Sequence, residues 1–243
     1  MKPVIKLNVL ARDVENAKQI VEEMQGRVFI GVMVKSFASI DLAIARIEEF
    51  QAAKIPVSVG LGGGDPAQWE KVVEVARRTK PAHVNQVFPA SGFTLGALKS
   101  VGSHHTLVNA LIQPSGTPGK VIIATGPMSR NYQDVVSCDT AAAMLAEIGV
   151  QSVKFYPIEG TKRLDEVAEM VKASVRQGIK TFEPTGGMDA KSLSQVLDIC
   201  IENGAEQIIP HVYTSIVDKA TGLTRLEDIR ELMQIISSGR YES

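Results

Sequence analysis

The segment SVKFYPIEG, residues 152–160, has the pattern of a short buried strand that carries one lysine and ends at a proline. Alternate side chains of a strand share a face, so Ser152, Lys154 and Tyr156 are expected to point the same way. A lysine on a buried strand is unfavourable unless it is paired or neutral, and a neutral lysine can attack a ketone to form a Schiff base. The segment therefore predicts either an amine catalyst or a strand-end lysine that reaches solvent or pairs with Glu159.

On both sides of this segment, short apolar runs alternate with amphipathic stretches of roughly 10–16 residues, the pattern of strands alternating with helices. Together with the lysine strand, which is the sixth, the apolar runs predict strands at Val4–Leu10, Val28–Val34, Val57–Leu61, His83–Phe88, Val121–Ala124, Ile179–Pro184 and Ile208–His211. Eight strand–helix units with no break in composition favour class α/β and a single (β/α)8 TIM barrel over residues 1–243. A doubly wound open sheet is the alternative, although no GxGxxG motif follows the first strand.

The middle of the chain is less regular than its ends. Leu107–Ile112 and Val121–Ala124 both resemble strands, and they flank the turn-rich loop PSGTPG at residues 114–119. Proline and glycine in this density predict a hairpin or an insertion around residues 107–124. We assign Val121–Ala124 as the fifth barrel strand. Helix caps are expected at Asp13, Ser39, Asp65 and either Asp139 or Thr140.

Composition restricts the classes of partner. The 243 residues include 26 basic and 27 acidic side chains, for a net charge of −1, which argues against nucleic acid and anionic membranes. No apolar run approaches the roughly 20 residues that a bilayer span needs. The first residues, MKPVIKLNVL, lack a signal-peptide pattern, so we expect a cytoplasmic protein. Two distant cysteines, Cys138 and Cys200, indicate neither a disulfide framework nor a zinc site.

In barrels of this kind the active site lies at the carboxyl ends of the strands. The seventh strand ends in Glu183-Pro184-Thr185-Gly186-Gly187, just before a helix. Two glycines in front of a helix leave backbone N–H groups free for a phosphate or a carboxylate, and the helix dipole adds attraction. The alternative is an ordinary glycine turn without a ligand.

Two carboxylates compete for the role of acid or base. Strand alternation puts Glu183 on the same face as Thr185, so Glu183 is expected to exchange protons with chemistry at Lys154, unless it is only a salt-bridge partner. Glu159, just past the lysine strand, is the competing acid or base, although a glutamate in a loop is more often solvated.

Other residues at strand ends add weaker signals. Lys35, at the end of the second strand, is expected either to bind a carboxylate or to lower the pKa of Lys154 by like-charge repulsion. Ser215, after the eighth strand, is expected to complete an anion site. Asn8, Gln86 and Thr125 are candidate polar lining residues. Single histidines at strand ends, His83 and His211, are more often hydrogen-bonded fillers than ligands, and we predict no metal site.

Several motifs together indicate a family. VKFYP at residues 153–157 and PTGG at residues 184–187 resemble the class I 2-keto-3-deoxy-6-phosphogluconate aldolases, whose corresponding segments read KFFPA and PTGG. The segments LNVLA, SVGLGGGDP, HVNQVF, SGTPG, EPTGG and IIPHVY resemble more closely a divergent branch, the KDGP aldolase family, and this resemblance covers most of the chain.

The resemblance implies roles for four residues. Lys154 corresponds to the Schiff-base lysine, Thr185 to a contact with pyruvate, and Gly186 and Gly187 to amides that bind phosphate. Two features depart from the better-known aldolases: the second strand, residues 28–35, lacks their glutamate, and the eighth strand lacks their GGS turn. Glu183 is our replacement for the missing glutamate.

The expected activity is therefore that of a class I aldolase. It would cleave the phosphorylated keto acid 2-dehydro-3-deoxy-6-phosphogluconate to pyruvate and glyceraldehyde 3-phosphate, with no cofactor, as a homo-oligomer. Three alternatives stay open: a 4-hydroxy-2-oxoglutarate aldolase that yields pyruvate and glyoxylate, a metal-dependent pyruvate lyase, and a non-catalytic barrel that binds phosphorylated sugar acids.

Overall fold

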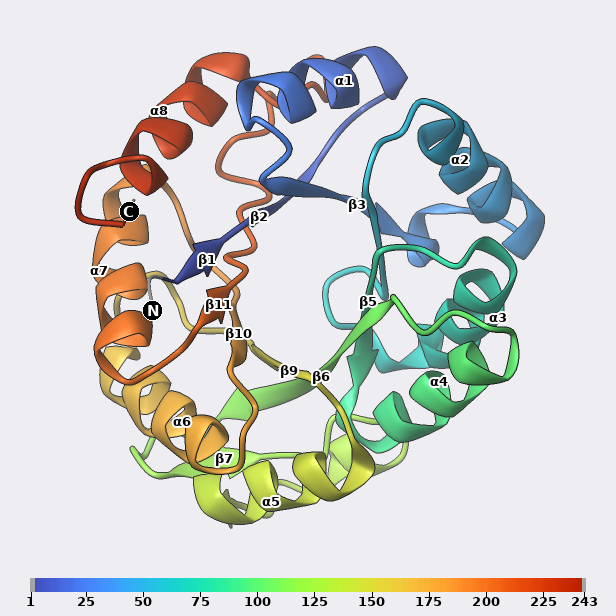
Figure 1. The fold of residues 1–243 in the computed structure, drawn as a ribbon. Coiled ribbons are helices and arrows are strands. Elements are labelled where there is room, and N and C mark those ends of the chain that lie inside the picture. Colours follow the sequence, from blue (N-terminus) through green and yellow to red (C-terminus); the bar gives the residue numbers. More distant parts are fainter. Residues whose placement is uncertain (1–2, 242–243) are drawn as a thin grey trace.

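Parallel strands close into a barrel in the computed structural model, which describes residues 3–241 (Figure 1). The strands follow one another in the order β1-β11-β10-β9-β6-β5-β4-β3-β2, and β1 and β2 are successive pieces of the first strand, so the ring is closed. The barrel strands are β1 (Val4–Ile5), β2 (Leu7–Leu10), β3 (Val28–Met33), β4 (Val57–Gly60), β5 (His83–Val87), β6 (Leu107–Pro114), β9 (Ser152–Phe155), β10 (Thr181–Pro184) and β11 (Gln207–Ile208). The predicted (β/α)8 barrel is confirmed.

A ring of helices surrounds the strands (Figure 1). They are α1 (Val14–Glu23), α2 (Ile40–Ala52), α3 (Trp69–Thr79), α4 (Phe88–Ser100), α5 (Cys138–Ile148), α6 (Leu164–Arg176), α7 (Ala190–Glu202) and α8 (Leu226–Ile236). The expected caps Asp13 and Ser39 each accept a hydrogen bond from the third residue beyond them. The expectation for α5 was wrong, because Ser137 caps that helix and accepts from the N–H of Thr140.

The hairpin in the middle of the chain is present, but the fifth barrel strand is its first arm. β6 lies parallel between β5 and β9, whereas β7 (Lys120–Ile122) runs antiparallel to the end of β6 and then pairs with β8 (Val136–Ser137) outside the barrel. The assignment of Val121–Ala124 to the barrel was therefore wrong. Two neighbouring parallel strands are connected through a crossover, usually a helix. Helix α4 makes this connection between β5 and β6, whereas the loop between β6 and β7 reverses the direction of the chain.

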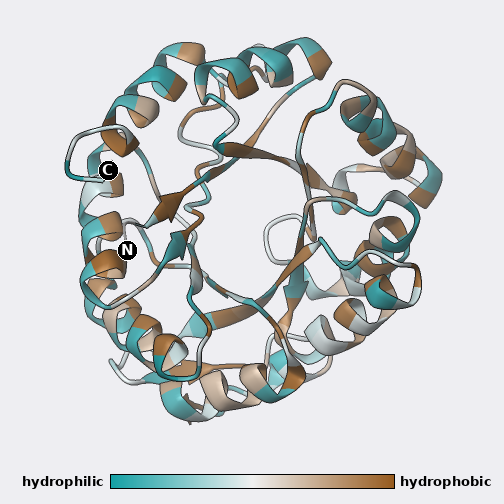
Figure 2. Ribbon diagram, viewed as in Figure 1, coloured by the Kyte–Doolittle hydropathy of each residue, from teal (hydrophilic) through white to brown (hydrophobic). Residues whose placement is uncertain are grey.

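The apolar core lies between the strands and the helices. Val153, Phe155 and Phe182 alternate with the polar positions of β9 and β10 and are almost fully buried. Figure 2 shows mostly brown strands, with helices banded in brown and teal as expected for amphipathic helices packed on a barrel. In the described part of the chain, no helix combines the length and the apolarity needed to cross a membrane.

The interior of the barrel contains a cluster of polar side chains. Strand register sets Asn85 opposite Asn109, and Asn109 opposite Ser152, so three polar side chains lie at one level. At the next level toward the carboxyl ends, Lys154 is paired with Glu183. This polar interior continues upward into the mouth of the barrel.

Candidate active site

A cavity of about 650 Å³ opens at the carboxyl ends of the barrel strands. Among the residues that the sequence singled out, it is lined by Lys154, Tyr156, Thr185, Gly186, Gly187, Ser215 and Gln86. Its lining also includes two residues that were given no catalytic role from the sequence, Asn85 and His211. The lysine strand and the double glycine of the seventh strand thus contribute to one site.

Lys154 is held inside the barrel by two hydrogen-bond partners. Its Nζ lies 2.9 Å from Oδ1 of Asn85 and 3.0 Å from Nδ1 of His211. The side chain is buried, and burial lowers the pKa of Lys154 to about 8, although the negative charge of Glu183 opposes the shift. A substantial fraction of this amine is therefore neutral near physiological pH.

Glu183, the register partner of Lys154 on the adjacent strand, has no exposed surface and does not line the cavity. Its carboxylate accepts four hydrogen bonds, from Ser152 Oγ at 2.5 Å, Asn109 Nδ2 at 2.7 Å, His211 Nε2 at 2.8 Å and His83 Nε2 at 3.0 Å. Burial by itself raises the pKa of Glu183, but the contacts with the two histidines bring it well below its usual value. Glu183 therefore has no direct access to a substrate in the cavity, and the expected exchange of protons between Glu183 and Lys154 would have to pass through His211.

The hydrogen-bond network assigns the tautomer of His83. Ser58 Oγ accepts from Nδ2 of Asn8 at 2.8 Å and from Nδ2 of Asn85 at 2.9 Å, so its own proton is left for Nδ1 of His83, 2.7 Å away. His83 thus carries its proton on Nε2 and donates it to Glu183. Asn8, expected at the cavity, is instead a buried support of this network.

His211 connects the buried carboxylate to the lysine. Its Nε2 donates to Glu183, which leaves Nδ1 as an acceptor facing both Nζ of Lys154 and the hydroxyl of Tyr213, each at 3.0 Å. Burial lowers the pKa of His211 to about 3, and the charge of Lys154 contributes, so the imidazole is neutral. From the sequence we expected His211 to be a hydrogen-bonded filler at the end of the eighth strand; the parallel bridge with Thr185 brings it beside the glycine pair.

The glycine pair is required by close backbone approach. Gly186 has φ +106°, and a Cβ on it would lie 3.1 Å from Cα of Pro157 and from Cδ2 of Tyr156. The carbonyl of Gly186 accepts from the N–H of Gly160 at 2.9 Å. The parallel bridge between Thr185 and His211 directs the N–H of Gly186 toward the carbonyl of His211. In residues 3–241 the N–H of Gly187 has no protein acceptor, which leaves it available to an anion in the cavity.

Two predicted site residues lie away from the cavity. Glu159 is 40% exposed and pairs with Arg163 at 2.8 Å, which lowers the pKa of its carboxyl. Lys35 is 58% exposed and pairs with Asp65 at 3.0 Å. The structure brings neither to the cavity wall, and the lowered pKa of Lys154 comes from burial instead of a like charge at Lys35.

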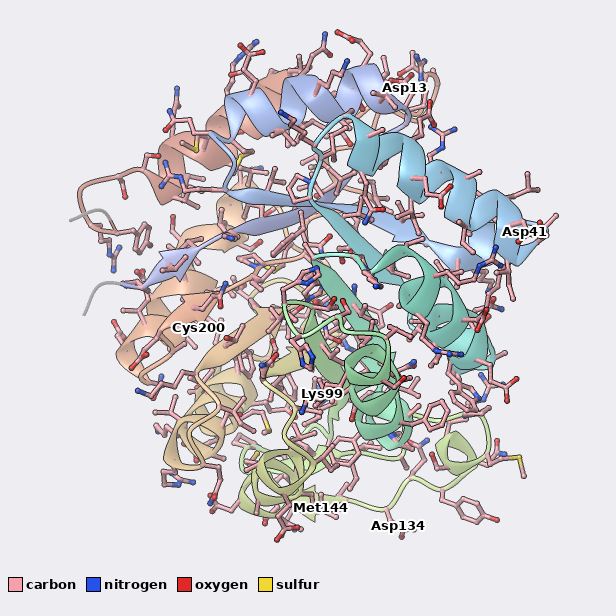
Figure 3. The ribbon with its side chains drawn as sticks, turned by 45° about the vertical axis from the view of Figure 1, so that its right-hand side comes forward. Asp13, Asp41, Lys99, Asp134, Met144 and Cys200 are labelled. Carbon is pink, nitrogen blue, oxygen red and sulfur yellow. The ribbon has the colours of Figure 1, made fainter. Side chains whose placement is uncertain are left out.

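Thr125 also has a purely structural place. Its hydroxyl accepts from the N–H of Phe88 at 2.9 Å and donates to the carbonyl of Leu111 at 3.0 Å. Three other carboxylates, Asp13, Asp41 and Asp134, lie at the periphery of the molecule, as Figure 3 shows. In the described residues no three His, Cys, Asp or Glu side chains are grouped as metal ligands.

One cation at the mouth was missed by sequence reasoning. Lys219, in the long loop after β11, lines the cavity together with Ser215 and Thr214. No ion pair of Lys219 occurs among residues 3–241, whereas the hydroxyl of Ser215 is engaged with the carbonyl of Met188 at 2.7 Å. The signal for Lys219 is only its position after the eighth strand, where barrel enzymes often bind phosphate.

Comparison with known proteins gives one family and one close sequence relative. A family model described as KDGP aldolase matches residues 1–220. A protein of Salmonella typhimurium, strain 14028s, named 2-dehydro-3-deoxy-phosphogluconate aldolase, is 42% identical over 235 residues, which cover 96% of this chain and 95% of that protein.

Solved structures share the fold at low sequence identity. Phosphoribosyl anthranilate isomerase from Thermococcus kodakaraensis superposes with a TM-score of 0.60 at 13% identity, covering 97% of this chain and all of that one. KGPDC from Streptococcus mutans gives 0.58 at 12% identity, with both chains fully covered. At these identities the likeness supports the barrel fold alone.

Proposed function

Because this chain belongs to the KDGP aldolase family, we propose that it cleaves 2-dehydro-3-deoxy-6-phosphogluconate to pyruvate and glyceraldehyde 3-phosphate through a Schiff base at Lys154. The chain is an aldolase, a carbon–carbon lyase, and its relative in Salmonella is named for this substrate. The site residues and the covalent intermediate are the new part of the proposal.

The observation that carries the proposal is the environment of Lys154. Its amine lies at the floor of the cavity, is buried, and has a pKa of about 8. A primary amine that is partly neutral and open to a cavity is the nucleophile that a class I aldolase requires. Binding alone gives no reason to bury a lysine without a carboxylate in contact with its Nζ.

The reaction follows from the chemistry of an imine. The neutral amine of Lys154 attacks the C2 ketone, and loss of water yields a protonated imine, which draws electrons from the C3–C4 bond. Removal of the C4 hydroxyl proton breaks that bond and releases the aldehyde. The remaining enamine takes up a proton at C3, and hydrolysis frees pyruvate and the lysine.

The upper part of the cavity supports a phosphorylated substrate. The free N–H group of Gly187 lies just ahead of α7, where the helix dipole favours an anion. Lys219 adds a positive charge from the loop that follows the neighbouring strand, β11. We propose that these groups hold the phosphate, and that Thr185, beside the lysine strand, contacts the pyruvate half.

Release of pyruvate tests the activity and its alternatives. The purified protein is supplied separately with 2-dehydro-3-deoxy-6-phosphogluconate and with 4-hydroxy-2-oxoglutarate, and lactate dehydrogenase reports pyruvate. We expect kcat/KM to be at least tenfold higher with the phosphorylated substrate. A preference for 4-hydroxy-2-oxoglutarate would favour that alternative, activity lost in EDTA would favour the metal-dependent lyase, and tight binding without pyruvate would favour a binding barrel.

We also propose that the chain forms a homo-oligomer in the cytoplasm and that residues 1–243 fold as one domain. Exposed apolar side chains outside the barrel mouth support association: Phe93 is 63% exposed, Tyr132 67% and Met128 79%. Light scattering coupled to gel filtration gives the subunit number, and a single unfolding transition in calorimetry is the result expected for one domain.

A further inference from the structure

We infer that His211 is the group that exchanges protons with Lys154 while the Schiff base forms and hydrolyses, and that Glu183 positions it. This inference rests on the proposed function and names the acid–base residue that the sequence motifs leave unassigned. His211 contacts the reacting nitrogen of Lys154 and is a catalytic residue. Glu183 contacts His211 but not that nitrogen, and is a positioning residue.

The contacts of the amine leave one acceptor that can take a proton. The partners of Nζ are Oδ1 of Asn85 and Nδ1 of His211, and an amide oxygen is not a base at neutral pH. Tyr213 lies next to His211, but burial raises the pKa of its phenol, and the single proton of its hydroxyl faces two acceptors, Nδ1 of His211 at 3.0 Å and Oδ1 of Asn8 at 3.2 Å. His211 is therefore the base in contact with Lys154.

The buried carboxylate determines which nitrogen of His211 faces the amine. Glu183 accepts the Nε2 proton at 2.8 Å and is itself fixed by donors from His83, Asn109 and Ser152. The ring cannot rotate to present Nε2 to Lys154 without leaving this carboxylate unpaired, which is unfavourable in a buried site. Nδ1 is thereby held as an acceptor 3.0 Å from Nζ.

Protons balance when His211 carries one of them through the cycle. The ammonium of Lys154 gives a proton to Nδ1, and the neutral amine adds to the ketone carbon. A proton then moves from the new C–N nitrogen to the alkoxide, giving a neutral carbinolamine. The imidazolium returns its proton to the carbinolamine hydroxyl, which leaves as water, and the nitrogen lone pair forms the protonated imine. Hydrolysis runs the same steps in reverse.

The charges around His211 change in the direction that this cycle needs. Burial is the main reason that the pKa of His211 is lowered, and the charge of Lys154 lowers it further while the lysine is an ammonium ion. Once the lysine nitrogen is part of a neutral carbinolamine, that repulsion is gone, and Glu183 still stabilises an imidazolium. His211 thus accepts and donates at successive stages.

The test measures Schiff-base formation without the rest of the reaction. Wild-type protein and variants are mixed with pyruvate, quenched with borohydride at increasing times, and the covalent adduct is quantified by mass spectrometry. We expect His211→Gln to slow adduct formation by about 100-fold. For His211→Ala, added imidazole is expected to restore the rate at least tenfold, a readout that a purely structural role of His211 would not produce.

Two other histidines serve as comparisons. His83→Gln removes a donor to the same carboxylate without changing a contact of Lys154. The rate of adduct formation is expected to fall less than tenfold in this variant. His105→Gln alters a histidine that lies outside the cavity and is expected to react like the wild type. Circular dichroism verifies that each variant is folded.

The outcomes separate this inference from the proposed function. No adduct in the wild type would overturn the Schiff base itself. A normal wild type together with a folded His211→Gln that reacts at the wild-type rate would overturn the role of His211 alone. Equal falls in the rate of adduct formation in His211→Gln and His83→Gln, with no imidazole rescue of His211→Ala, would show that both histidines have structural roles. That result would also overturn the catalytic role of His211.

Discussion

Lys154 and Glu183 occupy paired positions on the adjacent strands β9 and β10, and one imidazole bridges them. His211 lies 3.0 Å from the amine through Nδ1 and 2.8 Å from the carboxylate through Nε2. The opposite charges are thus separated by a ring that can carry a proton. This arrangement lets burial lower the pKa of the lysine, because the carboxylate does not form a direct ion pair that would hold the amine in its charged form.

The reactivity of Lys154 should depend on pH through the neutral amine. With a pKa of about 8, the neutral fraction rises about fivefold between pH 7 and pH 8 and levels off above roughly pH 9. We expect the initial rate of reductive adduct formation with pyruvate and cyanoborohydride to follow this curve. A midpoint near the ordinary lysine value of 10.5 would show that burial does not perturb the amine.

Glu183 should contribute to stability in a pH-dependent way. The pKa of its carboxyl is lowered on folding, so its contribution is full above its ordinary value of 4.5 and is lost as pH falls toward the folded-state pKa. Glu183→Gln, which leaves buried donors poorly matched, is expected to lower the free energy of unfolding by roughly 2–4 kcal/mol at pH 7. In urea unfolding, the difference from wild type should narrow below pH 4.5; a constant difference would contradict this assignment.

The glycine pair should tolerate no side chain. Gly186→Ala combines a positive φ of +106° with contacts of 3.1 Å to Pro157 and Tyr156. Gly178→Ala is the matched control, because Gly178 has φ +79° with nothing within 4 Å and is expected to lose only about 1–2 kcal/mol. Gly186→Ala should be less stable than this control and should raise KM for the phosphorylated substrate. Equal losses in the free energy of unfolding of the two variants would contradict this prediction, because they would mean that the loop around Gly186 can move to accommodate a side chain.

Two lysines near the mouth should behave differently. Lys219 lines the cavity, whereas Lys35 is paired with Asp65 outside it. Lys219→Ala is expected to raise KM for 2-dehydro-3-deoxy-6-phosphogluconate about tenfold, the loss of roughly 1.4 kcal/mol of binding, and to leave pyruvate trapping unchanged. Lys35→Ala is expected to have little effect on either. Steady-state kinetics of both variants give the two KM values. A larger rise in KM for Lys35→Ala than for Lys219→Ala would support the expectation that Lys35 binds a carboxylate.

The order of strands and helices was predictable because it rests on local periodicity. Apolar runs, caps such as Asp13 and Ser39, and glycine stops all act within a few residues, and the structure follows them. The fifth strand was misassigned because Leu107–Pro114 and Lys120–Ile122 are similar as segments, and only the direction of pairing separates them. Whether a strand pairs parallel or antiparallel depends on the connection that precedes it, and the apolar periodicity of the strand itself does not indicate this.

Within the site, the alternation of side chains along each strand could be predicted from the sequence, but the contacts between side chains of different strands could not. Lys154, Thr185 and the glycine pair were found from their own segments, and they line one cavity. The contact of Glu183 with His211 depends on how four strands meet inside the barrel, and our proposal that His211 and not Glu183 is the acid–base residue rests on that contact. Lys35 was misleading because its partner Asp65 lies on the next loop of the barrel.

The most direct test of the whole account is borohydride trapping followed by peptide mapping. Wild-type protein reduced in the presence of pyruvate is predicted to gain one adduct, found on the peptide that contains Lys154, and Lys154→Ala is predicted to gain none. A folded wild-type protein that releases pyruvate from its substrate yet remains unmodified, or that carries the adduct on another lysine, would contradict the account.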